Sequence, residues 1–258
     1  MFKASDNTTD KNIALFGIRP VIEAIRAGKE IDKILIQANI AGELFSELKK
    51  LIHEHKISFQ YVPVEKLNRI TPKNHQGVIG YTSSVEYYSI EEIIPQLFEA
   101  GKTPLILILD RITDVRNFGA IARTAECSGV DAIVIPSKGS AQINGDAIKT
   151  SAGALHEIKI CRSNNLKTTI DYLKESGLQL ISCTEKADTN LYDVNFSLPA
   201  AIIMGSEEDG ISGEYLKRSD HKVKIPLLGV IESLNVSVAA GVILYEAVRQ
   251  RNNNSLNG

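Results

Sequence analysis

The chain has 258 residues, of which 43% are hydrophobic and 23% are charged, and its formal net charge at pH 7 is −2. This composition excludes a wholly disordered chain and leaves room for one large domain or two smaller ones. The longest aliphatic run, Leu105–Leu109, is too short to cross a bilayer and the N-terminus lacks an apolar stretch flanked by basic residues, so we expect a cytoplasmic protein with no membrane partner.

The first block, residues 12–84, alternates helical and strand-like patterns and predicts a small α/β domain. Residues 1–84 carry 12 Lys+Arg against 9 Asp+Glu, a net charge of +3. This mild excess is compatible with contacts to phosphates and equally with a solvated surface. The predicted helices are Val21–Ala27 and Glu43–His55, and the predicted strands are Lys33–Ile36, Ile57–Val62 and Gly77–Tyr81.

Residues 85–103 separate the two blocks. They carry 1 Lys+Arg against 4 Asp+Glu and contain Pro95 and Gly101. We predict a linker here that is partly helical through Ile90–Glu99.

The second block, residues 104–250, repeats strand then helix, which predicts a parallel sheet covered on both faces. Ligands of such sheets bind outside the carboxyl ends of the strands. The predicted strands are Leu105–Leu109, Ala132–Ile135, Gln179–Ser182, Ala200–Met204 and Val223–Ile225, and the predicted helices are Phe118–Cys127, Leu166–Ser176, Ser212–Lys217 and Asn235–Arg249.

Cysteine and histidine usage predicts no metal centre. Cys127, Cys161 and Cys183 are odd in number and widely spaced, which indicates neither a disulfide framework nor a zinc site. The 5 histidines have no cysteine partners at ligand spacing.

Three loops at predicted strand ends carry unusual residues, and the first follows Leu105–Leu109. Asn117 lies at a helix entrance, where its side chain caps the helix or faces a ligand. Arg123 follows among small and apolar residues, so we expect it to be partly enclosed and to need a partner. A salt bridge to Asp110 or Asp114 is one reading, and a ligand contact is the other.

The second loop follows Ala200–Met204. Gly205 allows the backbone to approach a ligand closely, and Glu207 opens a run of three acids that is unusual for a plain turn. A solvated acidic turn is the alternative.

The third loop runs from Ile225 into the last predicted helix. Pro226 ends the strand because it cannot donate to a continuing ladder, and Ser233 or Asn235 can cap the helix. Unpaired backbone groups and these polar side chains also suit a binding site.

Two common nucleotide-binding patterns are absent from the sequence. No Gly-x-Gly-x-x-Gly follows the strand at Leu105–Leu109, and no Gly-x-x-x-x-Gly-Lys-Ser/Thr occurs in the chain. Hydride transfer with a dinucleotide and P-loop chemistry are therefore excluded as leading interpretations.

Taken together, the three loops resemble the motifs of the SpoU/TrmH family of RNA 2′-O-ribose methyltransferases, in the branch that modifies guanosine in large-subunit ribosomal RNA. The first motif is Asn117-Phe118-Gly119-Ala120 with Arg123, the second is Met204-Gly205-Ser206-Glu207 with Gly210, and the third runs from Ile225-Pro226 to Ser233-Leu234-Asn235-Val236-Ser237. The first block, with His75-Gln76-Gly77-Val78, is similar to the RNA-binding module of ribosomal RNA-modifying members, a fold shared with kink-turn-binding ribosomal proteins.

The resemblance implies a deep trefoil knot in the second domain, a feature that strand and helix patterns do not reveal and that general topology rules disfavour. It also implies a homodimer whose active site forms near the subunit contact, and RNA rather than DNA as the partner. S-adenosylmethionine is the implied cofactor, held in a bent shape by residues that include Thr184, Met204, Gly205, Ile225 and Leu234.

The implied catalytic residues are Asn117, Arg123, Glu207, Ser233 and Asn235. No histidine lies in the three loops, so the usual general base is missing. Because a guanidinium stays protonated, we expect Arg123 to stabilise the developing alkoxide or a neighbouring phosphate, with proton abstraction only if its charge is strongly perturbed. We expect the other polar side chains to orient ribose, Arg123 and cofactor, and Glu207 to pair with Arg123 or a polar neighbour.

The leading hypothesis from the sequence is methylation of a guanosine ribose in large-subunit ribosomal RNA. The same reaction on transfer RNA is the nearest alternative. A non-catalytic RNA-binding or ribosome-assembly factor is the third.

Overall fold

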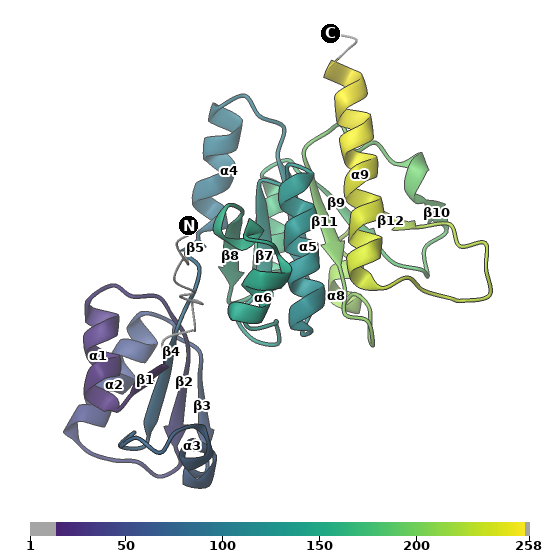
Figure 1. Cartoon of the computed structure of the whole chain (residues 1–258). Coiled ribbons are helices and arrows are strands. Elements are labelled where there is room, and N and C mark those ends of the chain that lie inside the picture. The colour runs from purple at the N-terminus through teal and green to yellow at the C-terminus, as the bar shows by residue number, and fades with distance from the viewer. Residues whose placement is uncertain (1–13, 256–258) are drawn as a thin grey trace, which may run out of the picture. The chain divides into compact units, whose positions relative to one another are not determined.

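The computed structural model describes residues 14–255, with side chains up to residue 252. The chain divides into two compact units with the main boundary between Ser84 and Val85 (Figure 1), and residues 143–145 group with the first unit. The predicted first block begins at residue 12, and its first two residues lie outside the described part. No helix in residues 14–255 is long and apolar enough to cross a membrane.

The first unit is a four-stranded mixed sheet with helices on both faces. β2 pairs in parallel with β3 and antiparallel with β4, and β4 pairs antiparallel with β1. α1 and α2 bury their apolar faces on one side, and α3 buries Leu67 on the other. The elements are β1 (Ala14–Phe16), α1 (Ile18–Arg26), β2 (Ile31–Gln37), α2 (Glu43–Glu54), β3 (Phe59–Val62), α3 (Val64–Ile70) and β4 (Val78–Thr82).

Two elements of this unit, β1 and α3, are absent from the sequence-based prediction. β1 has three residues and exists through its pairing with β4, so no periodic pattern could reveal it. α3 is a seven-residue helix with one buried residue, which leaves little amphipathic signal.

The turn before β4 is ordered by His75, a buried side chain. Its Nδ1 accepts a hydrogen bond from the backbone N–H of Gly77 (3.0 Å), and its Nε2 bonds to Oδ1 of Asn68 (2.8 Å). Since Nδ1 accepts, Nε2 carries the proton and donates it to Asn68. His75 is therefore a structural residue of this turn.

The second unit contains an eight-stranded sheet in which all the strands run parallel, as the sequence predicts for its core. The order across the sheet is β10-β12-β9-β11-β6-β7-β8-β5. Its strands are β5 (Tyr87–Tyr88), β6 (Leu105–Leu109), β7 (Ala132–Pro136), β8 (Lys159–Ser163), β9 (Gln179–Cys183), β10 (Thr189–Asn190), β11 (Ala200–Met204) and β12 (His221–Lys224).

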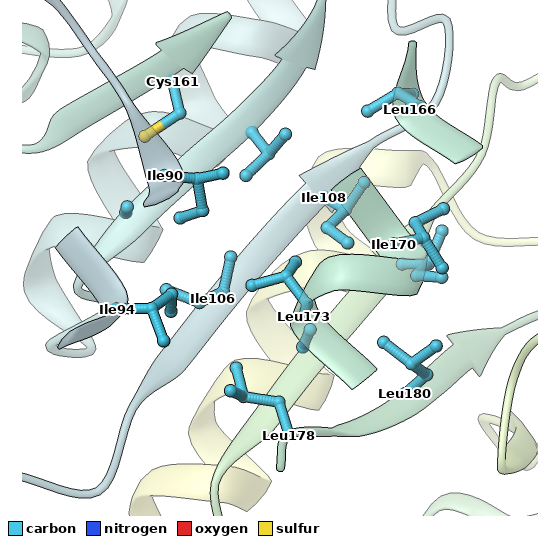
Figure 2. Packing of buried hydrophobic residues seen from close by; sticks show 14 of the residues in the cluster. Ile90, Ile94, Ile106, Ile108, Cys161, Leu166, Ile170, Leu173, Leu178 and Leu180 are labelled. Carbon is cyan, nitrogen blue, oxygen red and sulfur yellow. The ribbon is translucent and has the colours of Figure 1, made fainter. Parts of the chain in front are cut away.

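Helices cover both faces of this sheet. α4 (Ile90–Glu99) and α7 (Leu166–Glu175) bury apolar residues against one face (Figure 2). Partly buried residues of α8 (Gly213–Leu216) pack against the same cluster. Alternate residues of each strand face the other side, where α5 (Val115–Cys127) packs against α9 (Val236–Ser255) (Figure 1). β6 and β11 are buried along their whole length, so the loops that follow them start from a rigid frame.

The segment 85–103, predicted as a linker, is part of the second unit. Its β5 pairs with β8, and its α4 buries Ile90, Ile93, Ile94 and Leu97 in the core (Figure 2). The predicted partial helix is present, but the interpretation as a linker is wrong because the acidic residues lie on the solvent face of an amphipathic helix.

β8 and the turns before it were not predicted, since Lys159 and Arg162 interrupt the apolar pattern of the strand. The region between β7 and β8 contains α6 (Gly145–Thr150) and the 3₁₀ helix η1 (Ala154–His156). A second 3₁₀ helix, η2 (Leu191–Asp193), follows β10.

α5 approaches the α6 turn closely through Gly119. A Cβ at Gly119 would lie 2.7 Å from the carbonyl oxygen of Ala147 and 2.8 Å from Cβ of Thr150. These distances are shorter than van der Waals contact, so the absence of a side chain at Gly119 allows the two helices to meet.

We predict that Gly119→Ala lowers the free energy of unfolding by about 1–3 kcal/mol, the usual cost of overpacking. The clash with backbone outweighs the roughly 1 kcal/mol that alanine gains over glycine in a helix. Chemical denaturation of the two proteins measures the difference. Gly213→Ala is the matched control because no atom lies within 4 Å of its added Cβ, and equal stability of Gly119→Ala and wild type would contradict the prediction.

Candidate functional site

The three loops singled out in the sequence meet at the carboxyl edge of the large sheet. A cavity of about 220 Å³ opens where β9, β11 and β12 end and α9 begins. Its lining includes residues of the second and third loops and of the segment after β9. These are Cys183, Thr184, Glu185, Met204, Gly205, Ser206, Glu207, Gly210, Ile211, Ile225, Leu227, Ser233, Leu234, Asn235, Val236 and Ala239.

The side chain of Glu207 joins the three loops. Its Oε1 accepts hydrogen bonds from Nδ2 of Asn117 (3.0 Å) and from Nδ2 of Asn235 (2.8 Å). The backbone N–H of Val236, at the start of α9, donates to the same oxygen over 3.5 Å. A carboxylate at a helix N-terminus is stabilised by the helix dipole, so Glu207 is a structural hub and not only a solvated acidic turn.

Asn235 serves as helix cap and as site residue at once. Its Oδ1 accepts from the backbone N–H of Ser237 (2.9 Å), as a capping side chain does. Its Nδ2 donates to Glu207 and to Oδ1 of Asn117 (3.0 Å). The capping role expected of Asn235 is confirmed, and its role in ligand binding stays a prediction.

Asn117 is not the cap of α5. The cap is Asp114, whose Oδ1 accepts from the backbone N–H of Asn117 (2.7 Å). The Asn117 amide is therefore available to bond with Glu207 and Asn235.

Arg123 differs from the prediction. It was expected to be partly enclosed and paired, yet it is exposed on α5, and no hydrogen bond or ion pair joins its side chain to another residue of the described chain. Asp110 pairs with Arg111, and Asp114 caps α5. The salt-bridge reading is wrong because both carboxylates have other partners. Glu207 was expected to pair with Arg123 or with a polar neighbour, and its partners are two polar neighbours, the asparagines.

The residues implied to bind the cofactor lie together. Thr184, Met204, Gly205, Ile225 and Leu234 all line the cavity, and so does Ser233. Gly205 has an additional reason to be glycine, since a Cβ there would lie 2.1 Å from the carbonyl carbon of Gly210. The loop folds back on Gly205, with Ser206 and Gly210 forming a bridge.

The cavity lining has an acidic character. Glu185 and Glu207 line it, while none of the described lysines or arginines does. Such a lining attracts a positively charged group and repels an anion. Glu185 was missed because its signal, one acidic residue after a predicted strand, is too common to stand out.

The described residues contain no group of three or more His, Cys, Asp or Glu that could hold a metal ion. The polar groups of the site are instead amides, hydroxyls and carboxylates.

Comparisons with known proteins address the same two regions. The SpoU rRNA Methylase family matches residues 104–245, and the family of RNA 2′-O ribose methyltransferase substrate-binding domains matches residues 14–88. The chain belongs to the SpoU methyltransferase family. The resemblance predicted from the three loops is confirmed, and the protein is an RNA methyltransferase.

Relatives of this SpoU methyltransferase support the assignment along its length. A protein of Staphylococcus saprophyticus described as a TrmH family tRNA/rRNA methyltransferase is 36% identical over 242 residues, which cover 94% of this chain and 97% of the relative.

Two solved structures share its fold. The AdoMet-bound rRNA methyltransferase from Sinorhizobium meliloti matches with a TM-score of 0.59 and 23% identity over 92% of this chain and 86% of that one. The TrmH/SpoU tRNA modifying enzyme of A. aeolicus matches with a TM-score of 0.55 and 30% identity over 64% of this chain and 85% of that one.

Cys183 gives a chemical test of the SpoU site. Burial raises the pKa of its thiol to about 12, and the nearby charge of Glu185 acts in the same direction. Below that pH the thiol stays protonated, and a protonated thiol is a poor nucleophile.

We predict that at pH 8 iodoacetamide modifies the exposed Cys127 well before Cys183. Peptide mass spectrometry over a time course measures both rates. The buried Cys161, whose pKa burial also raises to about 12, is the internal control. Modification of Cys183 at the rate of Cys127 would contradict the raised pKa of this half-buried thiol.

Proposed function

We propose that this enzyme transfers a methyl group from S-adenosylmethionine to a ribose 2′-hydroxyl of RNA, and that its substrate is a guanosine of large-subunit ribosomal RNA. The observation that carries the proposal is the Asn117–Glu207–Asn235 cluster at the mouth of an acidic cavity. The families matched by both units agree with this reaction.

The residues of the cavity fit S-adenosylmethionine. Glu185 and Glu207 favour a ligand with positive charge, and Met204, Ile225 and Leu234 offer apolar surface to a purine ring. When bound, this cofactor supplies a methyl group on a positively charged sulfur. We assign Thr184, Met204, Gly205, Ile225 and Leu234 to holding it.

The polar side chains have two tasks, to align the ribose oxygen and to stabilise charge that develops on it. Ser233 and Asn235, which line the cavity, and Asn117, which bonds to Asn235, orient the ribose through their donors and acceptors. Glu207 holds the two asparagine amides in place. Arg123, as a permanent cation, stabilises the developing alkoxide or an adjacent phosphate.

Arg123 acts, in this proposal, on the site of a partner subunit. It is exposed on α5 and its side chain makes no hydrogen bond or ion pair within the described chain. α5 packs against α9 (Figure 1). On α9, Val238 and Tyr245 are exposed apolar residues. A homodimer that covers this surface would bury both residues and bring Arg123 near the partner's cavity.

The ribosomal substrate is favoured over transfer RNA by domain composition. The rRNA methyltransferase of S. meliloti matches 92% of this chain, so it has a counterpart of both units. The tRNA modifying enzyme of A. aeolicus matches 64% of the chain, so about a third of the chain has no counterpart there.

We assign RNA binding to the first unit, because residues 1–84 carry a net positive charge in a chain whose net charge is negative. Its likeness to kink-turn-binding ribosomal proteins stays a prediction. The trefoil knot implied for the second unit also stays a prediction, and it concerns the path of the chain between β12 and α9.

We predict that Arg123→Ala lowers kcat by about 10²–10³, the usual effect of removing one group that stabilises developing charge. The fold and the affinity for S-adenosylmethionine are expected to stay unchanged, because Arg123 does not line the cavity. A radiolabelled methyl-transfer assay, circular dichroism and calorimetry measure these quantities. Full activity of Arg123→Ala would exclude the role.

Mixed dimers test on which subunit Arg123 acts. Arg123→Ala is combined with Gly205→Trp, which disrupts the cavity because any side chain at Gly205 collides with the backbone of Gly210, after each is shown to be folded, dimeric and inactive alone. If Arg123 serves the partner's site, the mixed dimer regains activity at the site with an intact cavity. If it serves its own site, mixing restores nothing, and the proposed subunit arrangement is wrong.

We predict that a strain lacking this gene loses one ribose methylation in large-subunit ribosomal RNA. Mapping of 2′-O-methylation across total RNA measures it, with complementation by the wild type and by Arg123→Ala as paired controls. Loss of a transfer RNA methylation would support the alternative substrate. An unchanged map would exclude catalysis and leave the non-catalytic RNA-binding role.

A further inference from the structure

Arg111, the second residue after β6, has an unusual backbone conformation. Its φ is +59°, a left-handed value that residues with a side chain adopt infrequently. No feature of the local sequence predicts it. In this conformation the Arg111 side chain reaches the loop that follows β11.

The Arg111 guanidinium bonds to two adjacent residues of the acidic loop, Asp209 and Gly210, and to the preceding residue, Asp110. Nη1 donates to Oδ2 of Asp209 (3.0 Å), and Nη2 donates to the carbonyl oxygen of Gly210 (3.2 Å). Nε and Nη2 donate to the two carboxylate oxygens of Asp110 (3.0 and 3.2 Å). This is the bidentate pairing that suits a planar guanidinium.

Asp110 anchors that guanidinium to the sheet. It is 2% exposed, and its backbone N–H donates to the carbonyl oxygen of Met204 (2.8 Å). Its Oδ2 also accepts from the backbone N–H of Ser212 (2.8 Å). Asp110 and Arg111 thus contact the chain before, within and after the loop of residues 205–210.

Four residues of this loop line the cavity, namely Gly205, Ser206, Glu207 and Gly210. Glu207 also bonds to Asn117 and Asn235. The loop also has internal bonds, from the N–H of Gly210 to the carbonyl of Ser206 and from the N–H of Asp209 to Oγ of Ser206. These bonds make the loop rigid, so the clamp formed by the contacts of Arg111 with Asp209 and Gly210 also fixes the position of Glu207.

We propose that Arg111 is a positioning residue of the methyl-donor site: its guanidinium holds the 205–210 loop against the end of β6 and so sets the affinity for S-adenosylmethionine. This inference rests on the proposed function for its ligand. Arg111 does not line the cavity, so it acts through the loop residues that do, beginning with Gly210, whose carbonyl oxygen it contacts.

The test uses the full-length protein and three variants at one position. Arg111→Gly removes the clamp and suits the left-handed backbone, Arg111→Gln keeps a side chain without the charge, and Arg111→Lys keeps the charge without the planar fork. Arg116→Gln is the matched control, since Arg116 is an exposed arginine five positions away and makes no ion pair within the described chain.

Calorimetric titration with S-adenosylmethionine gives the first result. We expect Arg111→Gly and Arg111→Gln to weaken binding roughly tenfold, in the range found for residues that act through a contact network. We expect Arg111→Lys to fall between these variants and the wild type, and Arg116→Gln to bind as the wild type does. In methyl transfer, KM for S-adenosylmethionine should rise while KM for RNA stays constant.

Hydrogen exchange of the ligand-free proteins gives the second result. Loss of the clamp should speed exchange of the amides in residues 206–212 in Arg111→Gly, with the rest of the second unit unchanged. Faster exchange through the whole unit would show a general loss of stability and overturn the positioning role. Should Arg111→Gly not fold, Arg111→Gln carries the same comparison.

The outcomes separate this inference from the proposed function. Wild-type affinity in both Arg111→Gly and Arg111→Gln would overturn the inference while leaving the function standing. A wild-type protein without measurable affinity for S-adenosylmethionine would overturn the proposed function, and the ligand part of the inference with it. The exchange of residues 206–212 would still decide whether Arg111 clamps the loop.

Discussion

The site depends on one carboxylate oxygen, Oε1 of Glu207, which receives donors from two other segments of the chain. Asn117 lies 90 positions before Glu207, and Asn235 lies 28 positions after it. Hydrogen bonds to an ionised acceptor are stronger than neutral ones, and the start of α9 adds favourable dipole ends. Hydrogen bonds to this charged oxygen therefore hold together the β6–α5 connection, the loop after β11 and the start of α9. Their strength depends on the positions of the donor groups.

The parallel sheet makes that convergence possible by presenting strand ends at one edge. β6 and β11 pair along their full length and are buried, so their following loops begin from fixed points. Arg251 fixes the other end of α9. Its guanidinium donates to the backbone carbonyls of Thr103, Pro104, Phe196 and Leu198, and burial lowers its pKa. Helix α9 is thus held at both ends while its first turn forms the cavity wall.

Most of the sheet was predictable because a buried strand leaves a continuous apolar run. Leu105–Leu109 and Ala200–Met204 have the predicted bounds. β8 was not predictable, since its polar residues disguise a pattern that only its neighbours β5 and β7 complete. The linker interpretation of residues 85–103 failed for a related reason, because acidic composition describes the exposed face of α4 and not its buried one.

For the site, sequence motifs identified residues better than they identified partners. Asn117, Glu207 and Asn235 come together as a cluster, but the sequence left open whether Glu207 pairs with Arg123 or with a polar neighbour. It also predicted a partly enclosed Arg123, which the described chain leaves exposed. The exposure of Arg123 depends on which residues pack against that face of α5, and the local sequence does not encode those neighbours. The sequence analysis missed Arg111 because its neighbours show no pattern that predicts a left-handed backbone. Its contacts are also with residues about a hundred positions away in the chain.

The late position of α9 in the chain has a consequence for biosynthesis. During translation the strands through β12 leave the ribosome first, while Glu207 still lacks its donors Asn235 and Val236. A polypeptide interrupted before that point contains a sheet but no completed cavity wall. We therefore expect a chain terminated before α9 to be inactive. Methyltransferase activity requires that the final helix has been synthesised.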